Sequence, residues 1–172
     1  MMEPVINPLY VLLFNLAKVG LIGWVLLVFL PRWKVTNWII DEGIFPLYLS
    51  LLYSISLIAM VKALGGQLLL INFDNYADVY RLFANPEFWT VFWIHILAFD
   101  QVVGMLIYND NQNGRYIPVW AQSIILAGVL FVGPLAMLVY LILRFRGRQA
   151  EKRRAAAAGS AAPAPPRATA TV

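Results

Sequence analysis

Hydrophobic residues in this chain gather into four long runs, which are separated by shorter polar or mixed segments. A helix of about 20 apolar residues can cross the ~30 Å hydrocarbon core of a bilayer. Because each run is about that long, the pattern predicts an all-α polytopic membrane bundle of four transmembrane helices. The predicted spans are Leu9 to Leu30, Ile44 to Leu64, Phe88 to Tyr108 and Ile117 to Leu143.

The segment between the second and third runs mixes apolar and charged residues at near-helical spacing. This spacing predicts an interfacial helix that lies along the cytoplasmic surface. Asn85 and Pro86 follow it and are typical of a helix start, so they introduce the third span. The apolar face of the interfacial helix would consist of Leu69, Phe73, Tyr76, Val79, Tyr80 and Phe83.

Two further signals concern the second half of the chain. Asn109 to Arg115 form a short polar segment, which predicts a turn between antiparallel third and fourth spans. Gly133 and Pro134 lie inside the fourth run. A proline at such a position removes a helical hydrogen bond, so the pair predicts a kink in the fourth helix.

Composition places the chain among membrane proteins. Of its 172 residues, 61% are hydrophobic and only 13% are charged, and its mean hydropathy is +0.71. Soluble domains carry about 25% charged residues. One bundle, residues 1–146, therefore accounts for most of the chain. Residues 147–172 are basic and then rich in alanine and proline, which predicts a disordered cytoplasmic tail.

The net charge of +4 is concentrated behind the last run. Basic residues mark the cytoplasmic side of membrane helices, so the C-terminus is expected in the cytoplasm. Four crossings would place the N-terminus there as well. Charge that gathers at a membrane boundary does not indicate a nucleic-acid partner. The chain shows no apparent targeting segment, which favours a bacterial inner membrane over a plastid membrane. The basic residues are Arg144, Arg146, Arg148, Lys152, Arg153, Arg154 and Arg167.

Several kinds of chemistry are excluded by what the chain lacks. It has no cysteine and a single histidine, which rules out thiol chemistry and disulfides and leaves no metal-ligand motif. It also has no Gly-rich phosphate loop and no convincing Ser/His/Asp constellation. The sequence therefore indicates no metal site and identifies no cofactor.

Polar residues interrupt the third run, FWTVFWIHILAFDQVVGMLIY, at His95, Asp100 and Gln101. Ionisable groups at such depth are costly in hydrocarbon and often mark a ligand site, a proton pathway or a partner charge. Asp100 and His95 are the candidate catalytic residues. At ~100° per residue they lie about 140° apart around the helix, so they do not share one face. The alternative to a catalytic role is a structural one, in which each side chain joins two helices through a hydrogen bond or an ion pair.

Lys18 in the first span is a candidate partner for Asp100. Helical rise places these residues roughly 14 and 18 Å from the cytoplasmic surface, within reach of a long side chain. An ion pair between them would offset two isolated charges in the membrane. An aromatic-lined cleft beside the carboxylate would suit a long apolar ligand. The other candidate ligand-binding residues are Asn15, Tyr53, Trp93 and Gln101.

The chain also resembles a known family over roughly residues 8 to 146. The resemblance rests on FPLYLSLLYS, on NPEFWTVFWIHILAFDQVVGMLIYND and on IPVWAQSIILAGVLFVGPLAMLVYLILR. Within these, the most specific elements are WIH followed by FD, the turn at Asp110 and the GP pair. They resemble the ABA4-like membrane proteins, whose plant members are linked to neoxanthin formation from violaxanthin.

This resemblance implies carotenoid (xanthophyll-type) or related isoprenoid metabolism in a photosynthetic or pigmented membrane. Epoxide isomerisation would need proton transfer, which Asp100 and His95 could provide, with Lys18 tuning the carboxylate. The alternative is a non-enzymatic subunit that binds carotenoid or lipid within a membrane pigment assembly. A proton-coupled carrier is a third reading, but the chain lacks two matched halves. The expected partners are membrane lipids, a carotenoid-like ligand and other membrane proteins.

Overall fold

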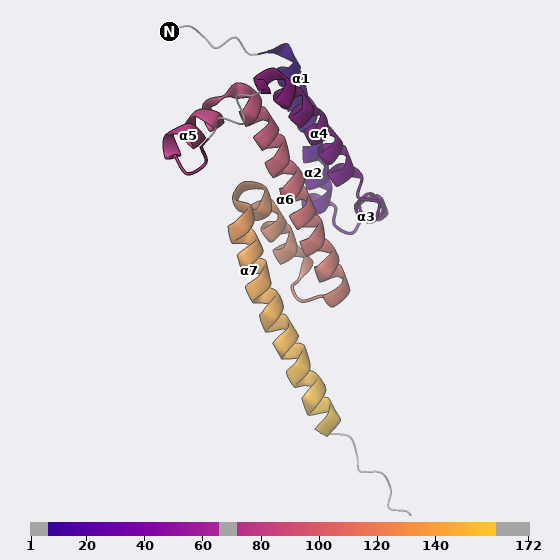
Figure 1. Ribbon diagram of the computed structural model, residues 1–172. Helices are drawn as coiled ribbons and strands as arrows, with labels where there is room; N and C mark the ends of the chain where they lie inside the picture. Colours follow the sequence, from indigo (N-terminus) through magenta and orange to yellow (C-terminus); the bar gives the residue numbers. More distant parts are fainter. Residues whose placement is uncertain (1–6, 66–71, 161–172) are drawn as a thin grey trace, which may run out of the picture.

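The computed structural model describes residues 7–65 and 72–160, and these ranges contain helices and no strand. Four helical segments are long and apolar enough to cross a membrane, as predicted. The chain is thus an integral membrane protein with an all-α fold (Figure 1). In chain order the helices are α1 Pro8–Ala17, α2 Gly20–Phe29, α3 Lys34–Asp41, α4 Ile44–Leu64, α5 Tyr76–Ala84, α6 Pro86–Gly114 and α7 Val119–Ser160.

The first span consists of two helices, α1 and α2, which are joined by a short break at Lys18 and Val19. Backbone bonds across the break connect residues three apart, for example Val19 N to Leu16 O at 3.0 Å. The same Leu16 carbonyl also accepts a hydrogen bond from the Tyr48 hydroxyl of α4, at 2.9 Å. The break is therefore supported by the neighbouring span.

α6 is the central helix of the bundle and contacts α1, α2, α4, α5 and α7. The Asn85 side chain accepts a hydrogen bond from the Phe88 N–H at 2.9 Å, and Pro86 occupies the first turn. The predicted start of the third span is thus confirmed. Ile94 and Ile107 of α6 are almost completely buried, at 0% and 1% exposure.

The end of α6 differs from the prediction. The helix continues through the polar residues that the sequence assigned to a turn and ends at Gly114. Arg115 then reverses the chain with a left-handed φ of 48°. Asn111 explains the difference, because its buried side chain exchanges hydrogen bonds with the backbone of Ile117, at 3.0 and 3.1 Å. An apparent turn residue thus serves inside the helix as an anchor for the turn that follows.

α7 reverses its direction at the predicted kink. Val132 has non-helical dihedral angles, φ −139° and ψ 51°, directly before Gly133 and Pro134. Beyond this point the helix runs back along its own first half (Figure 1), so that a Cβ on Gly147 would lie 3.1 Å from Tyr116 Cβ. The position of the kink was predicted correctly. Its size was not, because the fourth run forms a hairpin of two antiparallel arms.

The hairpin changes the expected topology. Its first arm, Val119 to Phe131, rises only about 20 Å, which is too short for the ~30 Å hydrocarbon core. The fourth run therefore enters the bundle and returns to the same end. Four complete crossings would place both termini on one side of the membrane, whereas α1 begins and α7 ends at opposite ends of the bundle (Figure 1). The side of the membrane that each end faces stays a prediction.

Two further predictions concern the segments at the ends of the bundle, the interfacial helix and the tail. The predicted interfacial helix corresponds to α5, which packs beside the start of α6 through rings of Phe83 and Phe88 with centroids 5.1 Å apart. Its predicted residue Leu69 lies outside the described residues. The tail was expected to be disordered from residue 147, but α7 continues to Ser160. Alanine, arginine, lysine and glutamate dominate this stretch, and all are strong helix formers.

The reversal predicts that α5 and the C-terminal arm face opposite sides of the membrane. The chain has no native cysteine, so Tyr76→Cys and Lys152→Cys can be tested singly with a membrane-impermeant maleimide. We expect labelling of Lys152→Cys from the cytoplasm, where the basic arm is favoured. Tyr76→Cys should then be labelled from the outside, opposite to the cytoplasmic position that the sequence suggested for this helix. Labelling of both positions from one side would contradict the hairpin topology.

Candidate functional site

The carboxylate of Asp100 lies against the tip of the α7 hairpin. A Cβ placed on Gly133 would be 2.7 Å from Asp100 Oδ1, so no larger residue fits there without movement. Asp100 occupies the middle of α6, which places the hairpin tip at the middle of the bundle. Among the described residues it takes part in no ion pair and no hydrogen bond. Its carboxylate is therefore a candidate for contact with a ligand.

His95 lies on a different face of α6 from Asp100, as its spacing predicted. Its ring is 5.3 Å from the ring of Tyr53 on α4 and 4.6 Å from the ring of Phe99. Asp100 instead faces the hairpin of α7. The two candidate catalytic residues therefore have separate surroundings.

An aromatic stripe, defined as Phe88, Phe92, His95 and Phe99, follows one face of α6. The rings of His95 and Phe99 are in contact, and those of Phe88 and Phe92 stack at an interplanar angle of 10°. At the end near α5, the ring of Phe83 meets Phe92 edge-on at 4.8 Å. Phe99 is 62% exposed at the other end of the stripe. The stripe thus leads from α5 to the depth of Asp100.

The predicted ion pair between Lys18 and Asp100 is wrong. Lys18 Nζ donates a hydrogen bond to Asn15 Oδ1 at 2.8 Å and lies 4.9 Å from the centre of the Phe14 ring. These contacts keep the lysine on the exposed face of the first span. α1 buries a different set of residues against its neighbours, namely Tyr10, Leu13 and Ala17. The charge of Lys18 is therefore accommodated locally, within its own helix.

The remaining candidate residues are distributed over several helix contacts. Gln101 is 1% exposed, and its Nε2 lies 2.8 Å from where a Cβ on Gly23 would be. It therefore packs between α6 and α2. The Trp93 ring lies 6.2 Å from Phe14 of α1. The candidate ligand-binding residues consequently do not form one site together with Asp100. They are Asn15, Lys18, Tyr53, Trp93 and Gln101.

A polar cluster at the far end of α6 was not predicted. Asp110 accepts a hydrogen bond from the Tyr140 hydroxyl at 2.5 Å and forms an ion pair with Arg144, whose Nε lies 2.5 Å from Oδ2. The cluster joins α6 to the second arm of α7. The sequence does contain a signal, because Tyr140 and Arg144 are four residues apart and share a helix face. The sequence does not show that this face packs against Asp110, because that contact depends on the reversal of α7.

The comparisons agree with the resemblance seen in the sequence. A family model described as ABA DEFICIENT 4-like, the ABA4-like family, matches residues 12–140. The chain belongs to the ABA4-like family. The match begins within α1 and ends at Tyr140, so it covers most of the first span, all of α4 and α6, and the hairpin tip beside Asp100. No curated protein and no solved structure matches the chain.

The polar cluster should contribute to stability through the second arm. Arg144→Gln removes the ion-pair partner of a partly buried carboxylate, and we expect a measurable loss in unfolding free energy. Tyr140→Phe, which removes one hydroxyl, should cost about 1 kcal/mol. Unfolding in detergent, followed by circular dichroism, measures both.

Arg146→Gln is the matched control, because Arg146 is exposed and takes part in no hydrogen bond or ion pair among the described residues. We expect a change below about 0.5 kcal/mol for this variant. Equal losses for Arg144→Gln and Arg146→Gln would contradict the assignment of a specific contact between α6 and α7.

Proposed function

We propose that this protein acts in the membrane on a xanthophyll-type carotenoid or a related isoprenoid. The observation that carries the proposal is membership of the ABA4-like family over residues 12–140. The geometry around Asp100 adds independent support, since a carboxylate without a described partner lies at the middle of a span. Ionisable residues in such positions commonly have a functional role.

The surroundings of Asp100 suit a long apolar ligand that arrives from the lipid phase. Phe99 precedes it on α6 and is strongly exposed, while Phe131 at the hairpin tip is 82% exposed. Val132, beside Phe131, is also exposed. A polyene that lies along the aromatic stripe would remain in contact with lipid and aromatic rings. Its oxygenated end ring could then reach the carboxylate at the middle of the bundle.

The proposed reaction is the isomerisation of an epoxide to an allenic alcohol. The C–O bond of the epoxide breaks as a carboxylic acid delivers its proton to oxygen, and the carboxylate that results accepts the proton that leaves carbon. The reaction consumes no oxidant or reductant. We assign proton delivery to Asp100, because general acid catalysis requires a proton donor within hydrogen-bond distance of the reacting oxygen.

His95 receives a different role. Its contacts with Tyr53 and Phe99 place it within the aromatic stripe and away from the face of Asp100. We therefore assign it to ligand packing and not to a shared acid–base couple. The same separation favours a second candidate function, a carotenoid-binding subunit without catalytic activity, because His95 does not assist Asp100 beside the hairpin tip.

Expression in a host that accumulates epoxy-xanthophylls and lacks this protein tests the proposal. Chromatography should detect a new isomer of unchanged mass with the unaltered chain. Asp100→Asn should reduce its formation at least about 100-fold, the usual contribution of a general acid. Asp74→Asn is the matched control, since Asp74 is exposed near α5, and it should leave the product unchanged.

His95→Phe tests whether His95 packs against the ligand or transfers a proton. Phenylalanine preserves an aromatic ring but cannot transfer a proton, so this variant should keep most of the product. Loss of the product in His95→Phe to the extent seen in Asp100→Asn would contradict our assignment for His95. An unchanged pigment profile, with pigment bound stoichiometrically to the purified protein, would support the carotenoid-binding subunit and overturn catalysis.

A further inference from the structure

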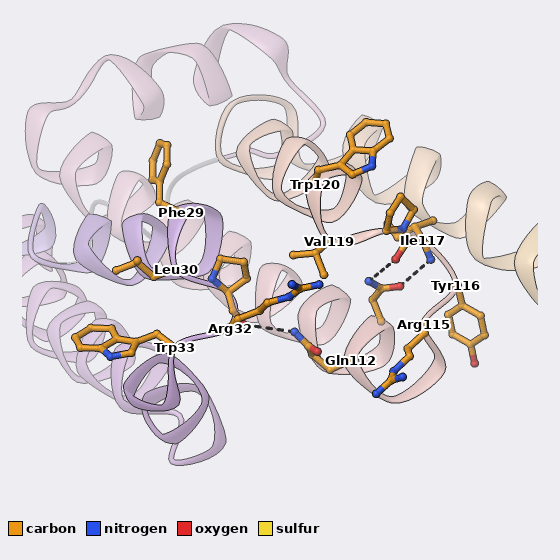
Figure 2. Close-up of a pocket in the computed structure, with 13 residues that line it drawn as sticks. Phe29, Leu30, Arg32, Trp33, Gln112, Arg115, Tyr116, Ile117, Val119 and Trp120 are labelled. Atoms are coloured by element: carbon orange, nitrogen blue, oxygen red, sulfur yellow. Dashed lines mark hydrogen bonds between the residues drawn. The ribbon is translucent and has the colours of Figure 1, made fainter.

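A groove of about 1130 Å³ opens at the end of the bundle opposite α5. One wall is the turn from α2 to α3, with Pro31, Arg32 and Trp33, and the other is the turn from α6 into α7 (Figure 2). This groove lies at the far end of α6 from α5, about half the length of that helix from Asp100. It is separate from the site proposed for a carotenoid.

Hydrogen bonds to α6 hold both walls of the groove. The Tyr108 hydroxyl contacts the Pro31 carbonyl and the Asn37 side-chain oxygen, and Gln112 Nε2 donates to the same carbonyl at 3.4 Å. On the other side, the backbone of Ile117 is hydrogen-bonded to the side chain of Asn111 on α6 (Figure 2). The groove is therefore formed by the fold itself, before any ligand binds.

Two guanidinium groups belong to the lining of this groove. Arg32 extends from one wall into the space in front of Val119, and Arg115 lies beside Gln112 on the opposite wall (Figure 2). Neither arginine forms an ion pair within the described residues, where Asp110 is paired with Arg144. Two unpaired cations in one groove favour an anionic ligand. Arginine suits phosphate in particular, because its planar fork can bind two phosphate oxygens at once.

The rim of the groove is aromatic and exposed. Trp33 is 49% exposed, Trp120 is 68% exposed and Phe29 is 75% exposed. Tryptophan is enriched at the boundary between hydrocarbon and headgroups, where its ring contacts both regions. This rim is at the end of α2 and the start of α7, so the groove lies at headgroup depth. A ligand there would carry a phosphate beside an apolar chain.

From this combination we propose that the groove binds the phosphate headgroup of an anionic phospholipid. The guanidinium groups of Arg32 and Arg115 hold the phosphate, and the acyl chains lie over Phe29 and Trp120. The basic arm of α7 leaves the bundle at this end, which is the side expected to face the cytoplasmic leaflet. Anionic lipids of that leaflet attract basic protein surfaces.

Native mass spectrometry of the full-length protein in mild detergent tests this proposal. Phosphatidylglycerol and phosphatidylcholine are titrated separately, and the lipid-bound fraction is measured for each. We expect one saturable phosphatidylglycerol molecule per chain. The double variant Arg32→Gln/Arg115→Gln should weaken its binding about tenfold or more, as expected when charge-assisted hydrogen bonds are lost. Both arginines are exposed, and circular dichroism verifies that the variant remains helical.

Arg153→Gln/Arg154→Gln is the matched control, because it removes the same charge from the exposed basic arm outside the groove. We expect less than about a twofold change in phosphatidylglycerol affinity for it, because screened surface charges contribute little. Equal weakening in both double variants would overturn the proposal in favour of diffuse attraction. Equal binding of phosphatidylcholine would also overturn it. Competition by soluble pyrophosphate at micromolar concentration would assign the groove to a free phosphate ligand instead.

Discussion

The reversal of α7 depends on a constraint that the membrane imposes on its backbone. Inside hydrocarbon, every peptide group must find a hydrogen-bond partner within the protein, so an irregular turn at mid-depth requires protein around it. Here α6 provides that surface, because Gly133 approaches the carboxylate of Asp100 with no room for a side chain. The Asp110 cluster then joins the returning arm to the same helix through Tyr140 and Arg144. The position of the hairpin thus determines what lies beside Asp100 and how the end of α6 near Asp110 is joined to α7.

The two proposed sites follow from this arrangement. The hairpin ends at the middle of the bundle, beside Asp100. The half of α6 next to α5 carries the aromatic stripe, which leads to the depth of this carboxylate. Because both arms of the hairpin meet the bundle at the basic end, the turn from α6 into α7 faces the turn from α2 to α3. The first arrangement suits an apolar ligand, and the second suits an anionic headgroup.

Much of this fold could be predicted from the sequence. Run length and composition predicted the spans, because hydrocarbon thickness sets the length of a helix that crosses it. The start of α6 at Asn85 and Pro86 and the separation of His95 from Asp100 also follow from local rules. The family was recognisable because its motifs lie close together in the chain, and the family match extends over residues 12–140.

The rest required tertiary information. Proline and glycine within a helix predict a bend, but whether the chain bends or reverses depends on which surface can pack against it. Asn111 has the character of a turn residue, and only its contacts with Ile117 explain why it is helical. The partner of Lys18 was inferred from depth alone. Depth does not specify the direction of a side chain, and the hydrogen bond to Asn15 turns this one outward.

The distance between spin labels on the two arms of α7 tests the central claim most directly. Labels on Trp120→Cys and Gln149→Cys can be placed without interference, because the chain has no other cysteine. Pulsed electron paramagnetic resonance of the protein in lipid nanodiscs should give a distance below about 25 Å, since packed helices lie 8–10 Å apart. A continuous helix would separate the two positions by about 44 Å. A distribution centred near the longer distance would contradict the hairpin and the sites that depend on it.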